Sequence, residues 1–255
     1  MASLPLVSAP VVSLVVEAVD AGRLARVLPG LAAQAPAAQL VVVGPDIASL
    51  ADVVRTGAPD ALLIQAPHPA NFPQARNLGA GAADAPWLLF LDEGVGLQRS
   101  LAIRPQAGVV LAAAGSADRG LLVAADDFQR AEGYDEIIGD PQVAQADLLL
   151  RLAQAGVKRA TLPAHGLTRL PALDVPVPPP RPEDGLYQRI KSDLVRLGSI
   201  PDAASRHALL TEIRAALARA ADRGGAAEMH VHFRHARAGA SATRASLTYG
   251  IKTEP

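Results

Sequence analysis

Apolar runs of strand length alternate with amphipathic segments along the first 170 residues of the chain. Short continuous apolar runs are typical of strands that are covered on both faces, and apolar positions three or four residues apart are typical of helices. The strands predicted in this way are 11–16, 40–43, 61–64, 87–91, 108–112, 121–124 and 157–162. Because strands and helices alternate at short spacing, we predict an α/β fold with a mostly parallel sheet flanked by helices.

Polar residues predict where several of these helices begin. Asp20, Asp46 and Asp126 each precede an amphipathic segment and are of the residue type that caps helices. The helices expected after them, together with a later one, cover 21–34, 47–55, 127–132 and 142–155.

The stretch 71–92 joins a helix rich in small residues to the most apolar strand of the chain. Residues 79–83 are glycine and alanine, so this helix can lie close against a sheet. Asp92 and Glu93 follow the strand at its carboxyl end, which is where open α/β sheets bind ligands. A carboxylate in that place is positioned to hold a metal ion or a ribose hydroxyl.

A proline-rich segment, PALDVPVPPPRP, favours polyproline II and ends the alternating pattern. The predicted divisions are a sheet domain over 1–170, a linker over 171–183, a helical hairpin over 184–225 and a strand-like or extended tail over 226–255. The helical hairpin carries an apolar stripe, which packs either against the sheet domain or against a protein partner or second copy of the chain.

Composition narrows the classes of function. Half of the 255 residues are hydrophobic but only 3% are aromatic, so the core must be built mainly from alanine, valine and leucine. The net charge of −1 argues against a nucleic-acid binder, and the absence of cysteine excludes disulfides and thiolate metal sites. No apolar run approaches the ~20 residues that span a bilayer, and the apolar N-terminus lacks a basic leader, so we expect a cytoplasmic protein without a transmembrane segment.

Four segments, in order, resemble family 2 glycosyltransferases, which have the GT-A fold. ARNLG followed by WLLFLD resembles the family's segment that ends in the metal-binding DxD motif. AADDFQRAEGYDE followed by ADLLLRLAQAG is similar to its acceptor-side strand, turn and helix, and VVSLVVEA and LVVVGPD resemble its first two strands. The resemblance covers residues 10–170. It implies a GT-A domain that takes a sugar from a nucleotide-sugar donor with the help of Mn²⁺ or Mg²⁺.

The match is poorest at the positions where the family's chemistry lies. Asp92 matches the first acid of the DxD motif, but the second falls on Gly94, with Glu93 beside it. The catalytic base falls on Gln145, which cannot accept a proton at neutral pH. The acid that meets the nucleotide base is missing, and only Asp46, displaced by two residues, can substitute.

Two residues of the sheet domain and one group in the tail are further candidates. Arg76 either meets a nucleotide or diphosphate or is a surface arginine, and His165 either lies near the metal or is a loop histidine. In the tail, Glu228, His230 and His232 fall on one face of a predicted strand. Imidazole with carboxylate suits zinc, nickel or iron, and the alternative is a solvated polar face.

Two functions follow from these observations. The first is a pseudo-glycosyltransferase that serves as a binding or scaffold subunit, in which a protein partner or a second copy of the chain contacts residues 184–255. The second is an atypical active transferase that uses Asp92 with Glu93 and recruits Asp46, Asp126 or Asp127 as substitutes. Because general-base assistance alone is typically worth ~10²–10⁴-fold in rate, the replaced acids favour the first function.

Overall fold

The computed structural model describes residues 10–67, 72–97, 106–113, 120–136, 138–162, 167–169, 228–235 and 243–250, and six single positions between 184 and 215. The chain divides into two compact units, Met1–Pro178 and Pro179–Pro255. The proline-rich segment and most of the predicted helical hairpin lie outside the described residues, so the finer division at 171–183 and 184–225 stays a prediction.

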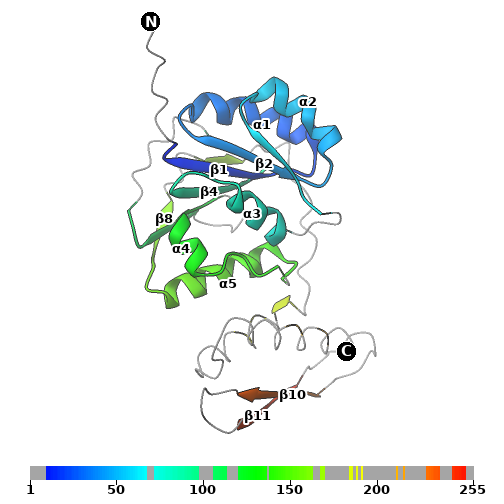
Figure 1. Ribbon diagram of the computed structural model, residues 1–255, viewed down its shortest axis with the longest axis vertical. Coiled ribbons are helices and arrows are strands. Elements are labelled where there is room, and N and C mark those ends of the chain that lie inside the picture. Colours follow the sequence, from blue (N-terminus) through cyan, green and yellow to red (C-terminus); the bar gives the residue numbers. More distant parts are fainter. Residues whose placement is uncertain are drawn as a thin grey trace, which may run out of the picture. The chain divides into compact units, whose positions relative to one another are not determined.

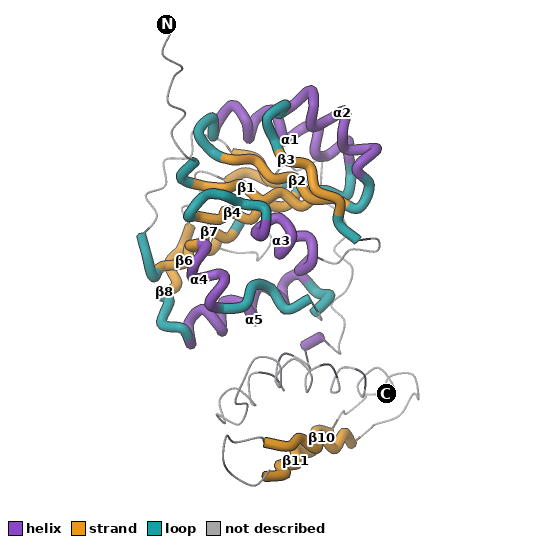
Figure 2. The backbone as a smooth tube through the Cα atoms, in the orientation of Figure 1, coloured by secondary structure: helices purple, strands orange, loops and turns teal. Residues whose placement is uncertain are grey.

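The first unit is built on a seven-stranded sheet with the order β3-β2-β1-β4-β7-β6-β8 (Figure 1, with all seven strands labelled in Figure 2). Its strands are β1 (Val12–Glu17), β2 (Gln39–Gly44), β3 (Leu62–Gln65), β4 (Trp87–Asp92), β6 (Val109–Ala113), β7 (Leu121–Ala124) and β8 (Lys158–Leu162). Among the described strand pairs of this sheet, only the two that involve β7 are antiparallel. The predicted mostly parallel sheet is confirmed.

Helices cover both faces of this sheet, as the alternating pattern predicted. The helices α1 (Ala21–Gln34) and α2 (Ile47–Gly57) lie together on one face, while α3 (Phe72–Gly81), α4 (Ala125–Arg130) and α5 (Pro141–Gln154) lie on the other (Figure 2). The apolar positions of α1 that point to the sheet are all buried: Leu24, Val27, Leu28 and Leu31.

Two of the three predicted helix caps are confirmed and one is wrong. Asp20 accepts a hydrogen bond from the backbone nitrogen of Arg23 at 2.8 Å, and Asp46 accepts one from Ala48 at 3.1 Å. Asp126 does not cap α4, because β7 runs directly into that helix and Ala124 occupies the N-cap position. Asp126 therefore lies within the first turn.

The small residues of α3 have the predicted role at one position. A Cβ atom on Gly79 would lie 2.3 Å from Cγ1 of Val15 on β1, so only glycine allows the observed approach of helix and sheet. Gly81, at the end of the helix, is exposed and has nothing within 4 Å of a built Cβ. The close approach brings the preceding turn of α3, with Arg76, against the end of β1.

A second, two-stranded antiparallel sheet was not predicted. It pairs β5 (Val95–Leu97), which follows the Asp92–Glu93 turn, with β9 (Leu167–Arg169). Three residues are too few for an alternating pattern to be recognised, and the pairing joins positions far apart in the sequence.

The second unit contains an antiparallel hairpin of β10 (Glu228–His235) and β11 (Thr243–Gly250). The division at 226–255 stays a prediction. Among the helices in the described part of the chain, none combines the length and the hydropathy that a bilayer crossing requires.

Candidate functional site

The site predicted from the sequence lies where β1, β2 and β4 end at one edge of the sheet, referred to below as the carboxyl edge. Because the three strands are parallel neighbours, their last residues meet there: Glu17 is in register with Asp92 on one side and with Val43 on the other. Residues in register on adjacent strands share a face of the sheet, so Glu17 and Asp92 are neighbours on the same face.

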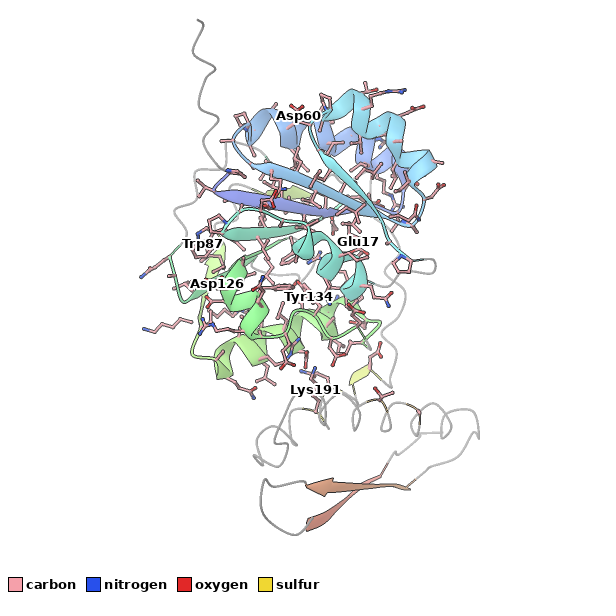
Figure 3. All side chains as sticks on the ribbon, in the orientation of Figure 1. Glu17, Asp60, Trp87, Asp126, Tyr134 and Lys191 are labelled. Atoms are coloured by element: carbon pink, nitrogen blue, oxygen red, sulfur yellow. The ribbon has the colours of Figure 1, made fainter. Side chains whose placement is uncertain are left out.

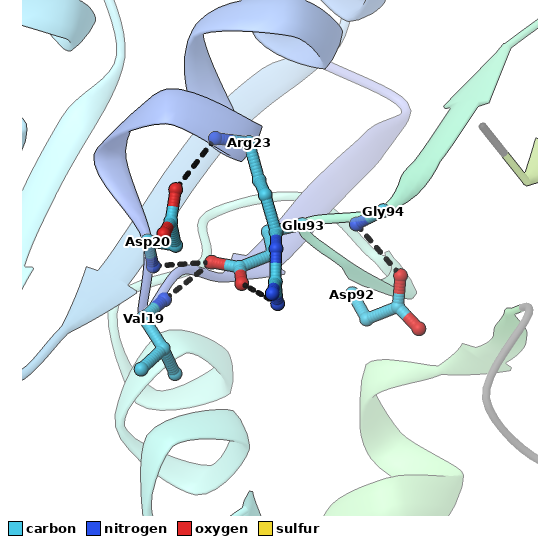
Figure 4. A network of polar contacts seen from close by, with 6 residues as sticks. All are labelled: Val19, Asp20, Arg23, Asp92, Glu93 and Gly94. Atoms are coloured by element: carbon cyan, nitrogen blue, oxygen red, sulfur yellow. Dashed lines mark hydrogen bonds and ion pairs between the residues drawn. The ribbon is translucent and has the colours of Figure 1, made fainter. Parts of the chain in front are cut away.

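The Glu93 carboxylate accepts hydrogen bonds from groups at the start of α1 (Figure 4). Its Oε2 atom accepts hydrogen bonds from the backbone nitrogens of Val19 at 2.5 Å and Asp20 at 2.7 Å. Its Oε1 atom accepts one from Nη1 of Arg23 at 3.1 Å. Burial raises the pKa of Glu93 above its usual value, while the two backbone donors and the Arg23 guanidinium lower it in part.

The Asp92 carboxylate points away from that of Glu93. Its Oδ1 atom accepts a hydrogen bond from the backbone nitrogen of Gly94 at 2.9 Å, and Figure 4 shows the two carboxylates turned to opposite sides. The part of the chain that the structure describes contains no group of three or more metal-ligating side chains. Mn²⁺ or Mg²⁺ prefers several converging oxygen ligands, so the predicted Asp92–Glu93 pair does not fit such an ion in this arrangement.

The end of β2 has no room for a side chain at Gly44. A Cβ atom on Gly44 would lie 2.4 Å from the backbone oxygen of Ala18 and 2.3 Å from Cδ1 of Leu50. The backbone nitrogen of Ala18 also donates to the oxygen of Val43 at 2.9 Å, which extends the β1–β2 ladder beyond the strands. Asp46, the predicted substitute, uses its carboxylate to cap α2.

The residue predicted for the family's catalytic-base position is a buried glutamine. Gln145 is 2% exposed, and its Oε1 atom has no hydrogen-bond partner among the described residues. Asp147, two residues on, is 1% exposed and forms an ion pair of 2.8 Å with Arg151. Arg151 also donates to the backbone oxygen of Ala131. Asp147 is therefore part of the packing between α5 and the turn after α4.

Asp126 and Asp127 lie far from the carboxyl edge that holds Asp92 and Glu17. They belong to the first turn of α4, and the residue before that helix, Ala124, pairs with Trp87 at the beginning of β4. Asp92 is at the other end of the same strand, roughly 16 Å away at the rise of an extended chain. In Figure 3, Trp87 and Asp126 are at the left end of the strands and Glu17 is at the right end.

Arg76 is not a surface arginine. Its side chain is fully buried, with the guanidinium carbon 4.0 Å from the ring centroid of Phe72 and 5.7 Å from those of Phe90 and Tyr134. Its Nη1 atom donates to the Tyr134 hydroxyl at 3.2 Å, and its Nε atom lies 3.9 Å from Oε2 of Glu17. The structure therefore places Arg76 beneath the carboxyl edge, close to the predicted site.

Glu17 is the residue of this edge that sequence reasoning missed. Its pKa is raised from 4.5 to about 7, because the effect of burial, with smaller contributions from the nearby Asp92 and Glu93, exceeds the lowering by Arg76. A signal was available in the sequence, because Glu17 is a single acid that ends the apolar run of a central strand. Such a residue is forced to lie at the sheet edge beside whatever ends the neighbouring strands.

The remaining candidates stay predictions. His165 lies outside the described residues. Glu228, His230 and His232 alternate along β10 and so share one face of the hairpin, in register with Gly250, Thr248 and Ser246. The tail metal site stays a prediction.

The fold is similar to those of solved glycosyltransferases at low sequence identity. GalNAc-T7, solved with UDP, GalNAc and Mn²⁺, aligns with a TM-score of 0.55 and 11% identity over 72% of this chain and 47% of that chain. TarS 1–349 from S. aureus aligns in complex with UDP with a TM-score of 0.52 and 12% identity, over 78% of this chain and 69% of that chain. A second structure of TarS 1–349 gives 0.50 and 11%, over 84% and 73%.

These similarities are carried by the backbone alone. The sequence matches no protein-family profile and no curated protein. The chain spans about half the length of the GalNAc-T7 structure. At such identities a structural likeness establishes the fold and leaves the activity open. The chain has the GT-A fold that its sequence predicted.

Proposed function

We propose that this chain is a glycosyltransferase-like domain that works as a binding or scaffold subunit and has lost ordinary metal-dependent sugar transfer. The observation that carries the proposal is the position of the Glu93 carboxylate, which accepts three hydrogen bonds at the start of α1. To join Asp92 at a cation, Glu93 must leave two backbone nitrogens and Arg23 without their acceptor. These contacts are partly buried, so each hydrogen bond lost costs about 1 kcal/mol.

The other expected parts of the chemistry support the same proposal. Gln145 replaces the base, Gly44 leaves no space for an acid at the end of β2, and Asp46 caps a helix. GalNAc-T7 was solved with UDP and Mn²⁺, so an active domain of this fold is expected to use a nucleotide and Mn²⁺ or Mg²⁺. In this chain, Asp92 alone matches the acids for that role.

Calorimetric titration of the full chain with UDP, other nucleoside diphosphates and nucleotide sugars, with and without Mn²⁺, tests the proposal. We expect no metal-dependent binding, no release of sugar from any donor, and no difference between the wild type and Asp92→Ala. Asp60→Asn, which removes an exposed acid ahead of β3, is the control for loss of charge. Micromolar binding that requires Mn²⁺ and disappears in Asp92→Ala only would overturn the proposal.

A scaffold role also requires a contact surface, which we assign to residues 184–255. The tail forms a two-stranded hairpin, and two strands alone are marginally stable in water, which supports their packing against something else. Co-purification and light scattering of the full chain and of a chain ending at residue 183 test this assignment. We expect a stoichiometric partner or a second copy to be lost with the deletion, and equal behaviour of both chains would contradict it.

One observation favours the alternative, an atypical active transferase that moves a sugar from a nucleotide sugar to an unknown acceptor. Glu17, beside Asp92, has a pKa of about 7, and general acid–base catalysis is most efficient with a group that titrates near the working pH. Sugar transfer by purified protein that falls by ~10²-fold or more in Glu17→Gln would establish this alternative.

A further inference from the structure

A pocket lies at the edge of the sheet where β4 begins and β7 ends, away from Asp92; it is called the amino-edge pocket. The antiparallel pairing of β6 with β7 places the beginning of β6 beside the end of β7. The residues that line the pocket come from the turn before β6 and from the junction of β7 with α4. Its volume of about 710 Å³ is in the range of sites that hold a small organic molecule.

Asp127 gives this pocket a buried carboxylate with an unused acceptor. Its side chain is 5% exposed, and its Oδ1 atom accepts a hydrogen bond from Nη2 of Arg130. The Oδ2 atom is buried and has no hydrogen-bond partner among the described residues. Buried carboxylate oxygens are normally hydrogen-bonded, because their removal from water is costly. Asp127 therefore offers an acceptor to a ligand that brings a donor into the pocket.

The charges of the lining residues favour a cationic ligand. Asp126 and Asp127 carry two negative charges against the one positive charge of Arg130. Lys158, at the start of the neighbouring strand β8, is not among the lining residues. Because the Arg130 side chain is 59% exposed, its ion pair with Asp127 is only a weak barrier to a competing cation.

The same pocket does not suit a bare metal ion. Ca²⁺ takes about six or more oxygen ligands, and no group of three or more metal-ligating side chains occurs within the described ranges. The walls formed by Ala107, Gly108 and Ala124 are small and carry no polar side-chain atoms. Such walls fit aliphatic carbon atoms, so the pocket combines a surface for a carbon chain with acceptors for a charged end.

We propose that the amino-edge pocket binds a small aliphatic diamine, with one ammonium group on Oδ2 of Asp127 and the other at Asp126. An ammonium group carries three donors and no acceptor, and its hydrogen bonds to carboxylates are strong. Asp126 is exposed and belongs to the same turn of α4, so it can meet the outer end of a short chain (Figure 3). The inference goes beyond the proposed function, because it concerns the edge of the sheet opposite to Asp92.

Calorimetric titration of the full chain with 1,5-diaminopentane, pentylamine and 1-pentanol tests the proposal. The three compounds share one carbon chain and carry two, one and no ammonium groups, and we expect their affinities to fall in that order. Asp127→Asn removes the charge of the buried acceptor and should weaken diamine binding at least about tenfold. Asp126→Asn removes an exposed charge and should weaken it by only about two- to fivefold.

Three further variants separate the pocket from general charge effects. Arg130→Gln removes the competing cation and should tighten diamine binding by about two- to fivefold. Ala107→Leu, at an exposed position, narrows the pocket without changing any charge and should weaken binding. Asp52→Asn is the matched control: Asp52 pairs with Arg55 at the same spacing, with side chains 80% and 77% exposed, so binding should be unchanged.

The proposal is wrong if millimolar diamine does not bind to the wild type, if 1-pentanol binds as tightly, or if Asp127→Asn, Arg130→Gln and Ala107→Leu all leave the affinity unchanged. Thermal unfolding establishes that each variant is folded. Should Asp127→Asn fail to fold, Ala107→Leu and Arg130→Gln decide the question. Mn²⁺-dependent donor binding bears on the proposed function alone and diamine binding on this pocket alone, so the two proposals fail separately.

Discussion

Helix α3 and the carboxyl edge lie next to each other, yet the polar residues of the two regions have different roles. In α3, Asn77 holds the turn after α4: its Nδ2 atom donates to the backbone oxygen of Tyr134 at 2.9 Å, and its Oδ1 atom accepts from the nitrogen of Tyr134 at 2.8 Å. Arg76 reaches the hydroxyl of the same tyrosine. At the carboxyl edge, the carboxylates of Glu93 and Asp46 accept hydrogen bonds from backbone nitrogens at the beginnings of α1 and α2.

This difference explains which parts of the glycosyltransferase resemblance are strong. The segments ARN and GYDE contact each other directly through Arg76, Asn77 and Tyr134, so together they fasten α3 to the turn that leads into α5. These hydrogen bonds stabilise the sheet domain whatever the chain binds. Acids that serve only a metal or a nucleotide are under no comparable structural requirement.

The largest expected effect concerns the packing of α3 against the sheet. Gly79→Ala places a methyl group 2.3 Å from Cγ1 of Val15 and should lower the free energy of unfolding by about 2–3 kcal/mol, because a close-packed contact must be forced apart. Gly81→Ala, where nothing lies within 4 Å, is the matched control and should be neutral or slightly stabilising. Urea unfolding of both variants gives the comparison, and equal midpoints would refute the close approach.

Asn77→Ala tests the fastening between α3 and the turn. The change removes both bonds to the Tyr134 backbone and the one to Oε1 of Glu136, and we expect a loss of about 2 kcal/mol. Glu136→Gln affects only the last of these contacts and should cost less than about 0.5 kcal/mol. Hydrogen exchange at the Tyr134 amide should accelerate in Asn77→Ala and remain slow in Glu136→Gln; unchanged protection in both would contradict this role.

Glu17→Gln examines the carboxyl edge through the pH dependence of stability. The pKa of Glu17 in the folded state, about 7, exceeds its usual value of 4.5, so the folded protein binds more protons than the unfolded chain between these values. The stabilising contribution of Glu17 is therefore complete below pH 4.5 and is lost as the pH rises through 7. The glutamine variant lacks this loss and should be more stable than the wild type by about 1–2 kcal/mol at pH 8, with little difference at pH 4.

Unfolding midpoints at pH 4, 6 and 8 measure this divergence. Asp52→Asn, on the exposed face of α2, should run parallel to the wild type over the same range. A constant difference between Glu17→Gln and the wild type at every pH would show that Glu17 is not the titrating group.

The smallest expected effect distinguishes a cap from a ligand. Asp46→Ala removes the bonds to the backbone nitrogens of Ala48 and Ser49 and should cost about 1 kcal/mol of stability. Asp46→Ser, which retains capping ability without the charge, should recover most of it. Any nucleotide binding that is lost equally in both variants would assign the carboxylate a role beyond the cap.

Much of the fold was predictable from the sequence because its signals are local. The apolar runs and the caps at Asp20 and Asp46 correctly predicted five helices and the seven strands of the main sheet. Errors arose where the signal was short or the junction abrupt. The three-residue strands β5 and β9 are too short to show an alternation of apolar and polar residues. Asp126 does not cap α4 because Ala124, the last residue of β7, already occupies the N-cap position.

The site was less predictable, because it depends on which way side chains turn. Asp92 and Glu93 are adjacent in sequence, which suggested that they act together, but consecutive residues at a strand end point to different sides. The neighbour of Asp92 is Glu17, 75 positions earlier, brought there by the parallel pairing of β1 and β4.

The amino-acid sequence by itself determined the alternation of strands and helices and the mainly aliphatic core, since each depends on residue type and local spacing. Only the tertiary structure decided that Arg76 is buried, that Glu93 holds the start of α1 and that Glu17 lies beside Asp92. These arrangements follow from the strand order and from the packing of helices on the sheet. Both bring together residues that are distant in the chain, so the amino-acid sequence carries no local pattern for them.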